Sequence, residues 1–162
     1  MRLAAILLAL VLGGTAGADT PKTPPTDWQR DYDGVVVSAD AGRARIEVLP
    51  ESADIPPWSV DRYAHVAVPD PTGRFLLIPN ADNLISSNDP DFVVYELYAA
   101  PGDRIGEVRL EQLIETYLLV PTVSHFIWVS NEHDWSGGGW RLTTPDGGRW
   151  KLKPDPFLLI LE

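Results

Sequence analysis

The stretch Pro69-Asp70-Pro71-Thr72-Gly73-Arg74-Phe75-Leu76-Leu77-Ile78 decides the fold class of this chain. Its first five residues combine proline, aspartate and glycine, which is typical of a tight turn. Residues 75–78 are apolar at every position, so both faces of this run are suited to burial. The sequence therefore predicts a turn that leads into a central, buried strand.

Runs typical of strands lie on both sides of this stretch. The expected strands cover residues 35–37, 45–49, 63–68, 75–78, 92–98, 105–109, 123–129, 140–143, 150–152 and 157–161. The turns Asp40-Ala41-Gly42 and Asp146-Gly147-Gly148 are typical of hairpins. We expect the last strand to be buried because it is apolar throughout. The pattern predicts a mainly β protein.

One segment has the apolar spacing of a helix instead. Leu110, Leu113, Ile114, Tyr117 and Leu118 recur at intervals of three and four residues, and polar residues lie between them. A proline at position 121 ends the pattern. The spacing predicts one short amphipathic helix.

A Gly-Arg pair follows a turn at residues 42–43, 73–74 and 148–149, each time before a short apolar strand. This element is common in the blades of β-propellers. A blade takes about 40 to 45 residues, and a closed ring needs at least about four blades. Without the first 18 of the 162 residues, which are typical of a signal peptide, 144 remain (162 − 18), enough for at most about three and a half blades. We therefore expect a single sandwich-like or curled antiparallel sheet domain with propeller-blade-like hairpins.

The first residues are typical of a secretory signal peptide. A basic start, Met1-Arg2-Leu3, precedes an apolar run at residues 4–12 and the cleavage pattern Ala16-Gly17-Ala18. The apolar run is shorter than the roughly 20 residues that cross a bilayer, so no membrane span is expected after cleavage. We therefore expect residues 1–18 to be removed and the protein to be exported, to the periplasm or the medium.

Residues 19–33 are polar and rich in proline, which predicts a tether. We expect Trp28 and Tyr32 to dock the end of this tether onto a β-rich domain of residues 34–162.

Charge and cysteine content exclude several classes of function. The net charge is −10, from 13 basic and 23 acidic residues, which disfavours nucleic acid and anionic lipid as partners. The chain has no cysteine, and so no disulfide framework, thiolate nucleophile or cysteine metal site.

The segments from His65 onward resemble a group of small exported bacterial proteins of undefined function. The pattern of that group is DGRYLVT-DN, then VVIYD, LEDLL and VPRSVSS-WW, closed by a DGR hairpin. The matching segments here are residues 70–77, 82–83, 92–97, 108–114, 120–128 and 146–150. His125 replaces a serine of the pattern, and Trp128 stands where a tryptophan pair is usual. The resemblance implies a secreted β-rich module and no particular activity.

An acidic, amide-rich loop follows the central strand. Its residues Asp82, Asn88, Asp89 and Asp91 carry oxygen ligands of the kind that Ca²⁺ prefers. The spacing does not match an EF-hand loop. The alternative is that these side chains form Asx-turns between strands.

His125, Glu132, His133 and Asp134 form an imidazole-carboxylate cluster in the sequence. Such residues can hold Zn²⁺ with one open position for water, which predicts a metal-dependent hydrolase as the alternative function. A hydrogen-bonded structural histidine is the other interpretation.

Three tryptophans lie near the glycine-rich loop of residues 136–139. Trp128, Trp135 and Trp140 are suited either to stacking on a ligand or to filling a small β core. We expect Trp135 and Trp140, which flank the loop, to be the exposed ones. The leading hypothesis is an exported, non-enzymatic binding module for a protein or carbohydrate ligand, with no cofactor.

Overall fold

The computed structural model describes residues 24–80, 84–85, 88–115, 118–122 and 126–162, without the side chains of Leu84, Ser130, Asn131 and Glu132. Within these ranges the chain is mainly β. The elements, in chain order, are β1 (Trp28–Tyr32), β2 (Val35–Asp40), β3 (Arg45–Pro50), β4 (Trp58–Val60), β5 (Val68–Pro69), β6 (Phe75–Pro79), β7 (Leu84–Ile85), β8 (Val93–Ala99), β9 (Asp103–Arg109), the 3₁₀ helix η1 (Leu110–Gln112), β10 (Val120–Pro121), β11 (Phe126–Ile127), β12 (Ser130–Trp135), β13 (Trp140–Thr143), β14 (Arg149–Pro154) and β15 (Phe157–Leu161).

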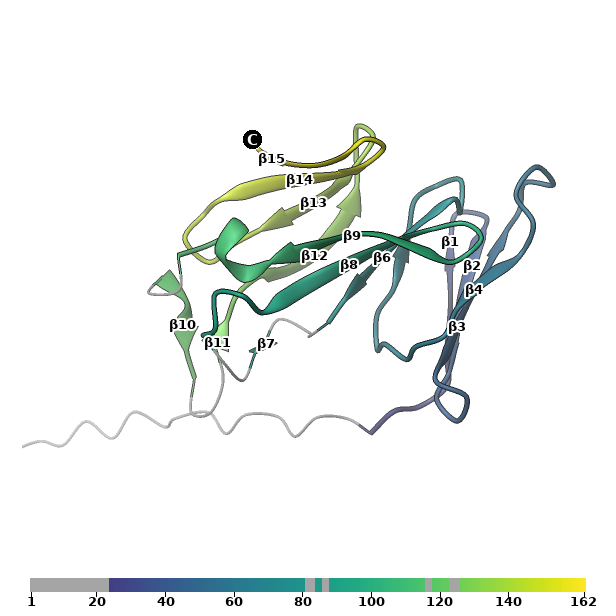
Figure 1. Cartoon of the computed structure of the whole chain (residues 1–162), viewed down its shortest axis with the longest axis horizontal. Coiled ribbons are helices and arrows are strands. Elements are labelled where there is room, and N and C mark those ends of the chain that lie inside the picture. The colour runs from purple at the N-terminus through teal and green to yellow at the C-terminus, as the bar shows by residue number, and fades with distance from the viewer. Residues whose placement is uncertain (1–23, 81–83, 86–87, 116–117, 123–125) are drawn as a thin grey trace, which may run out of the picture.

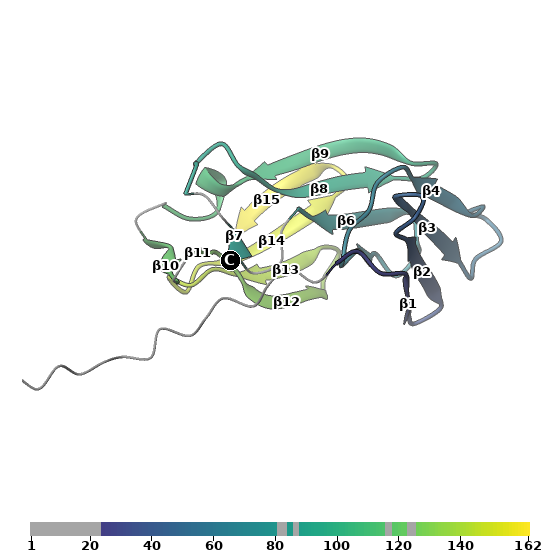
Figure 2. The same cartoon turned by 90° about the horizontal axis from the view of Figure 1, so that it is seen from below.

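Three of the sheets are four-stranded antiparallel meanders (Figure 1). We call them the N-terminal sheet (β1-β2-β3-β4), the middle sheet (β5-β6-β8-β9) and the C-terminal sheet (β12-β13-β14-β15). A smaller sheet has the order β10-β11-β7. The strands of each meander pair in chain order, as in a propeller blade, although in the middle sheet β7 of the smaller sheet lies in the chain between β6 and β8. Figure 2 shows β1 and β12 along one edge of the molecule and β4, β9 and β15 toward the opposite edge.

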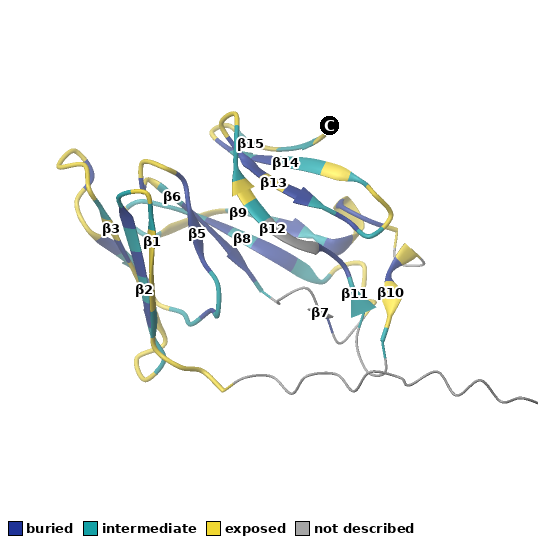
Figure 3. Cartoon of the chain, turned by 180° about the vertical axis from the view of Figure 1, so that it is seen from behind, coloured by how far each residue is buried: buried dark blue, intermediate teal, exposed yellow. Residues whose placement is uncertain are grey.

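The middle sheet lies between two hydrophobic cores. On β6, Leu76 and Ile78 pack with the N-terminal sheet, and Leu77 packs into the core shared with the C-terminal sheet. Successive side chains of a strand point to opposite faces, so the wholly apolar sequence of β6 serves both cores. Figure 3 shows the resulting burial. The predicted central strand is confirmed, and its turn at residues 70–74 is present.

The predicted helix is present only in its first residues. At the end of η1 the N–H of Ile114 donates to the carbonyl of Leu110, at 3.1 Å, as in an α-helix. Leu110, Leu113 and Ile114 are buried in the core, as their apolar spacing predicts. Residues 116–117 of the pattern lie outside the described residues. These apolar side chains are thus buried by tertiary packing, although very little helix forms.

The predicted strand at residues 63–68 is wrong except at its end, where β5 begins. The carbonyl of Ala64 accepts a hydrogen bond from the indole N–H of Trp28, at 2.8 Å, and the carbonyl of Ala67 accepts one from the Tyr32 hydroxyl, at 2.9 Å. Side chains of β1 therefore take the place that a neighbouring strand would fill. Trp28 and Tyr32 dock the chain as expected, but they do so from a strand, since β1 pairs with β2 inside the range predicted as tether.

Two other expectations differ from the structure. β15 is an edge strand, and Leu158 and Leu161 remain 46% and 62% exposed, so the prediction that it is buried is wrong. The Gly-Arg pairs at residues 42–43 and 148–149 follow the second strand of a meander, whereas the pair at 73–74 follows the first. Their recurrence therefore does not mark equivalent positions of a repeat.

Candidate functional site

A large hollow lies at the edge formed by the first strands of the three meanders. It has a volume of about 1020 Å³ and is lined by residues from the end of β1, from β5 and the turn after it, and from β12 to β14. A second hollow of about 800 Å³ continues it and shares Asp33, Asp70, Pro71 and Trp135 with the first. We call the two hollows together the inner-edge groove. Trp135 belongs to both parts, so it lies at their junction.

The three candidate tryptophans have different environments. Trp128 and Trp140 are 0% exposed and belong to the core, so the expectation that Trp140 is exposed is wrong. Trp128 packs edge-on against Tyr95, with ring centroids 5.1 Å apart. Trp135 is partly exposed, and its ring stands at 84° to that of Trp140, at 4.8 Å between centroids. The core thus fixes the orientation of the one tryptophan of the three that lines the groove.

The glycine-rich loop beside Trp135 is a tight hairpin turn. Trp135 and Trp140 are directly paired at the ends of β12 and β13, and the N–H of Ser136 donates to the carbonyl of Gly139, at 2.8 Å. A Cβ atom at Gly139 would lie 2.6 Å from the carbonyl oxygen of Leu152 on β14. The close approach of two backbones requires glycine there, which gives the sequence motif a structural explanation.

Charges of both signs line the larger hollow. Asp33 and Asp134 supply carboxylates, and Arg141 and Arg149 supply guanidinium groups. Glu162 also lines it and pairs with Arg141 at 3.2 Å and with Lys151 at 2.7 Å. The hydrogen bond from Lys151, with the charge of Arg141, lowers the pKa of Glu162. The hollow is therefore polar and acidic on balance, since Asp70 adds a fourth carboxylate to the two guanidinium groups.

Asp70 lines the groove but is committed to the turn before β6. Its carboxylate accepts hydrogen bonds from the N–H of Phe75 at 2.7 Å, from the N–H of Thr72 at 3.1 Å and from the Thr72 hydroxyl at 2.6 Å. Asp70 is only 4% exposed. We therefore assign it a structural role, because its oxygens already have donors.

The histidine-carboxylate cluster is only partly within the described residues. His125 and the side chain of Glu132 lie outside them. His133 points inward, where its Nε2 lies 2.8 Å from the Tyr95 hydroxyl, and burial lowers its pKa. Asp134 follows it on β12, is exposed and pairs in register with Arg141. Neighbouring strand residues face opposite ways, so His133 and Asp134 diverge. No group of three potential metal ligands occurs among the residues that the structure describes.

The described part of the acidic loop has the hydrogen bonds of an Asx-turn. Asp82 lies outside the described residues, while Asn88, Asp89 and Asp91 are exposed. The Asp89 side chain accepts a hydrogen bond from the N–H of Asp91, at 3.0 Å. Asp91 in turn pairs with Arg109 on β9, at 3.1 Å. These contacts agree with the turn-forming alternative for Asp89 and Asp91.

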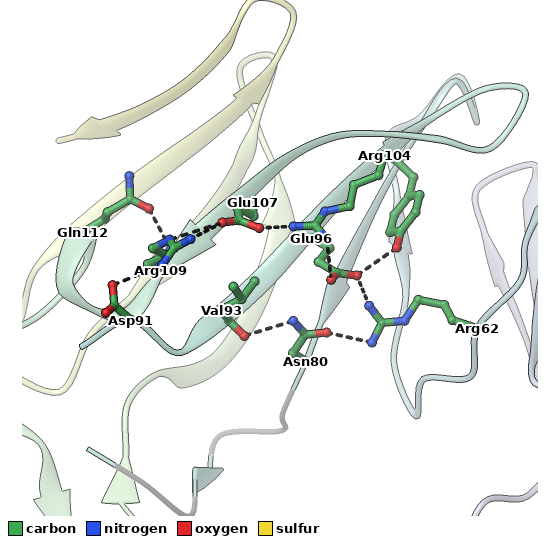
Figure 4. Close-up of polar contacts among 10 residues, drawn as sticks. Arg62, Asn80, Asp91, Val93, Glu96, Arg104, Glu107, Arg109 and Gln112 are labelled. Atoms are coloured by element: carbon green, nitrogen blue, oxygen red, sulfur yellow. Dashed lines mark hydrogen bonds and ion pairs between the residues drawn. The ribbon is translucent and has the colours of Figure 1, made fainter. Parts of the chain in front are cut away.

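A charged network on the middle sheet was not predicted from the sequence (Figure 4). Glu96 on β8 accepts hydrogen bonds from Arg62 and from the Tyr98 hydroxyl, the latter at 2.8 Å, and it pairs with Arg104 at 3.3 Å. Arg62 also donates to Asn80, at 2.7 Å. The network ties the segment after β4 to the middle sheet. Arg62 lies 34 positions from Glu96 and 18 from Asn80, so no local spacing predicts these contacts.

Comparison of the chain with protein-family models, with curated proteins and with solved structures found no match. In the described ranges, no helix has the length and apolar content needed to cross a membrane. The resemblance to small exported proteins therefore stays a prediction.

Proposed function

We propose that the chain is an exported, non-enzymatic binding module that holds a neutral oligosaccharide in the inner-edge groove, against Trp135. The observation that carries the proposal is the position of Trp135. It lies at the junction of the two hollows and is held edge-on by a fully buried tryptophan. A rigid aromatic side chain offers contact area at low cost in conformational entropy.

The polar lining supports a neutral sugar over an anionic ligand. Sugar hydroxyls donate and accept hydrogen bonds, so they suit carboxylates such as Asp33 and guanidinium groups such as Arg149 at once. An anionic ligand would be repelled, because carboxylates outnumber guanidinium groups in the lining of both hollows. The neutral ligand therefore gains hydrogen bonds without repulsion.

The size of the groove supports a ligand longer than a monosaccharide. Pockets for drug-sized molecules have volumes of about 300 to 1,000 Å³. The larger hollow alone has about 1020 Å³, and the second continues it past Trp135. We therefore expect a chain of several sugar rings, with one ring on the indole.

A glycan array followed by calorimetry tests the proposal. We expect the purified protein to bind a neutral oligosaccharide, and Trp135→Ala to weaken this binding about tenfold, equivalent to about 1.4 kcal/mol. Trp28→Ala is the matched control, because Trp28 lies outside both hollows. Binding unaffected by Trp135→Ala would overturn the site. Capture of extended peptides but no glycan, lost in Trp135→Ala, would keep the site and overturn the ligand class.

Export is tested separately. We expect the secreted protein to begin at Asp19, as N-terminal sequencing would show, because cleavage is predicted after Ala18. A protein retained with its first residues intact would contradict this part of the proposal.

A further inference from the structure

The last strand of the C-terminal sheet is an unprotected apolar edge. All five residues of β15 are apolar, and among the strands that the structure describes β14 is its only neighbour. The corresponding outer strand of the middle sheet, β9, carries Asp103, Arg104, Glu107 and Arg109, and that of the N-terminal sheet, β4, has three residues. Charges and short length are the usual means by which proteins prevent edge-to-edge pairing. β15 has neither.

The hydrogen-bond register defines which backbone groups of β15 are available. The N–H of Glu162 donates to the carbonyl of Arg149, directly opposite, at 2.8 Å. Opposed pairs alternate along an antiparallel ladder between bonded and non-bonded, so residues 158 and 160 also bond to β14. The N–H and C=O groups of Phe157, Leu159 and Leu161 then point outward. No other described segment donates to or accepts from them through its backbone.

We propose that β15 pairs antiparallel with β15 of a second copy of this chain, about a twofold axis at Leu159. In this register Phe157 faces Leu161 of the second copy, and Leu159 faces its own equivalent. Each of these outward residues donates one hydrogen bond and accepts one across the axis. The two C-terminal sheets then become one continuous sheet.

The side chains are self-complementary in the same register. On the outer face, Leu158, 46% exposed, lies opposite Ile160 of the second copy. On the inner face, Leu161, 62% exposed, lies opposite Phe157 of the second copy. A twofold interface places the same surface on both sides, and this strand matches itself because it is apolar along its whole length. Both exposed leucines are covered without burying a charge of β15.

The surroundings of β15 permit a like copy to approach. The chain is strongly acidic overall, but Lys151 and Lys153 lie on the neighbouring strand, and Lys151 is paired with Glu162. Charges farther away are screened by salt over about 10 Å. Figure 2 shows β15 toward the edge opposite β1 and β12. None of residues 157–161 lines either hollow, although Glu162, directly after β15, lines the larger one. The proposal is independent of the proposed function.

The test measures the oligomeric state of the purified protein by sedimentation over a range of concentrations. We expect a dimer, and we expect Leu158→Lys and Leu161→Lys each to raise its dissociation constant at least about tenfold. Both positions are exposed, so the monomer tolerates lysine. Leu49→Lys is the matched control, since Leu49 is a 42% exposed leucine on β3.

A cysteine placed on the axis tests the register. The chain has no cysteine, so Leu159→Cys can crosslink only to its equivalent in a second copy. Directly opposed Cα atoms of a bonded pair lie about 5.5 Å apart, within the range of disulfides. We expect mild oxidation to give a covalent dimer, and Leu49→Cys to give none. A monomer at all concentrations, or a dimer that neither lysine weakens, would overturn the proposal.

Discussion

Replacing Asp70 by alanine removes the acceptor that holds the turn before β6. The carboxylate receives two backbone N–H groups and one hydroxyl, at distances between 2.6 and 3.1 Å, and is 4% exposed. In the alanine variant the N–H of Phe75, the first residue of the central strand β6, loses its side-chain acceptor. The Phe75 N–H is part-buried, so a water molecule replaces the lost carboxylate only in part and some of the free-energy cost remains.

The expected loss is about 3 kcal/mol of unfolding free energy. Hydrogen bonds to a charged group contribute about 1.5 to 3 kcal/mol each, but three bonds to one carboxylate are not additive. For a domain of this size the loss lowers the melting temperature by roughly 10 °C. Chemical denaturation of Asp70→Ala measures it, with Asp146→Ala as control. Asp146 makes two comparable turn contacts but is exposed, so about 1 kcal/mol is expected. Equal losses of unfolding free energy in the two variants would refute the argument that burial makes the hydrogen bonds of Asp70 more stabilising than those of Asp146.

Two further predictions concern the C-terminal sheet. Gly139→Ala should lower the free energy of unfolding by about 1 to 3 kcal/mol, because its Cβ would lie 2.6 Å from the Leu152 carbonyl oxygen. Gly42→Ala is the control in the same denaturation assay, since its Cβ would meet no atom nearer than 3.4 Å. Burial lowers the pKa of His133, and the charge of Asp134 only partly opposes this, so the folded protein binds that proton less readily than the unfolded chain. The free energy of unfolding should therefore fall as the pH drops below about 6.5. His133→Gln should flatten this part of the plot of unfolding free energy against pH. Equal slopes for the variant and the natural protein would contradict the role given to His133.

A strand could be predicted from the local sequence where its own order of apolar and polar residues matches the burial of its side chains. β6 was predictable because a short run that is apolar at every position can only be satisfied with packing on both faces. The hairpin of β2 and β3 was predictable from its turn and from alternation, which appears in the structure as alternating burial. In both cases the information lies within about ten residues.

The predictions that failed concern segments whose partners are distant. Residues 63–67 alternate like a strand, yet Trp28 and Tyr32 occupy their carbonyl groups from about 35 positions earlier. β15 has the composition of a buried strand, but whether a strand lies at the centre or the edge of a sheet depends on topology, which composition does not record.

The candidate site was predictable only in part. The sequence singled out Trp135, but it could not separate Trp135 from Trp140, because adjacent ends of a hairpin differ in exposure only through what packs on them. Asp33 and Arg141 join Trp135 in the groove from different sheets, and no local pattern relates them.

The largely polar outer faces of the N-terminal and C-terminal sheets explain how three meanders form a fold without closing a ring. The residues of β3 that point away from the core are Arg45, Glu47 and Leu49, and those of β14 are Arg149, Lys151 and Lys153. A further sheet stacked on either face would have to desolvate these charges, whereas the faces inside the stack are apolar. The stack can therefore end at both sheets, as capping repeats end a solenoid. Because the ring stays open, the edge that would line a central channel is accessible instead as a groove, and the position of Trp135 in that groove follows directly.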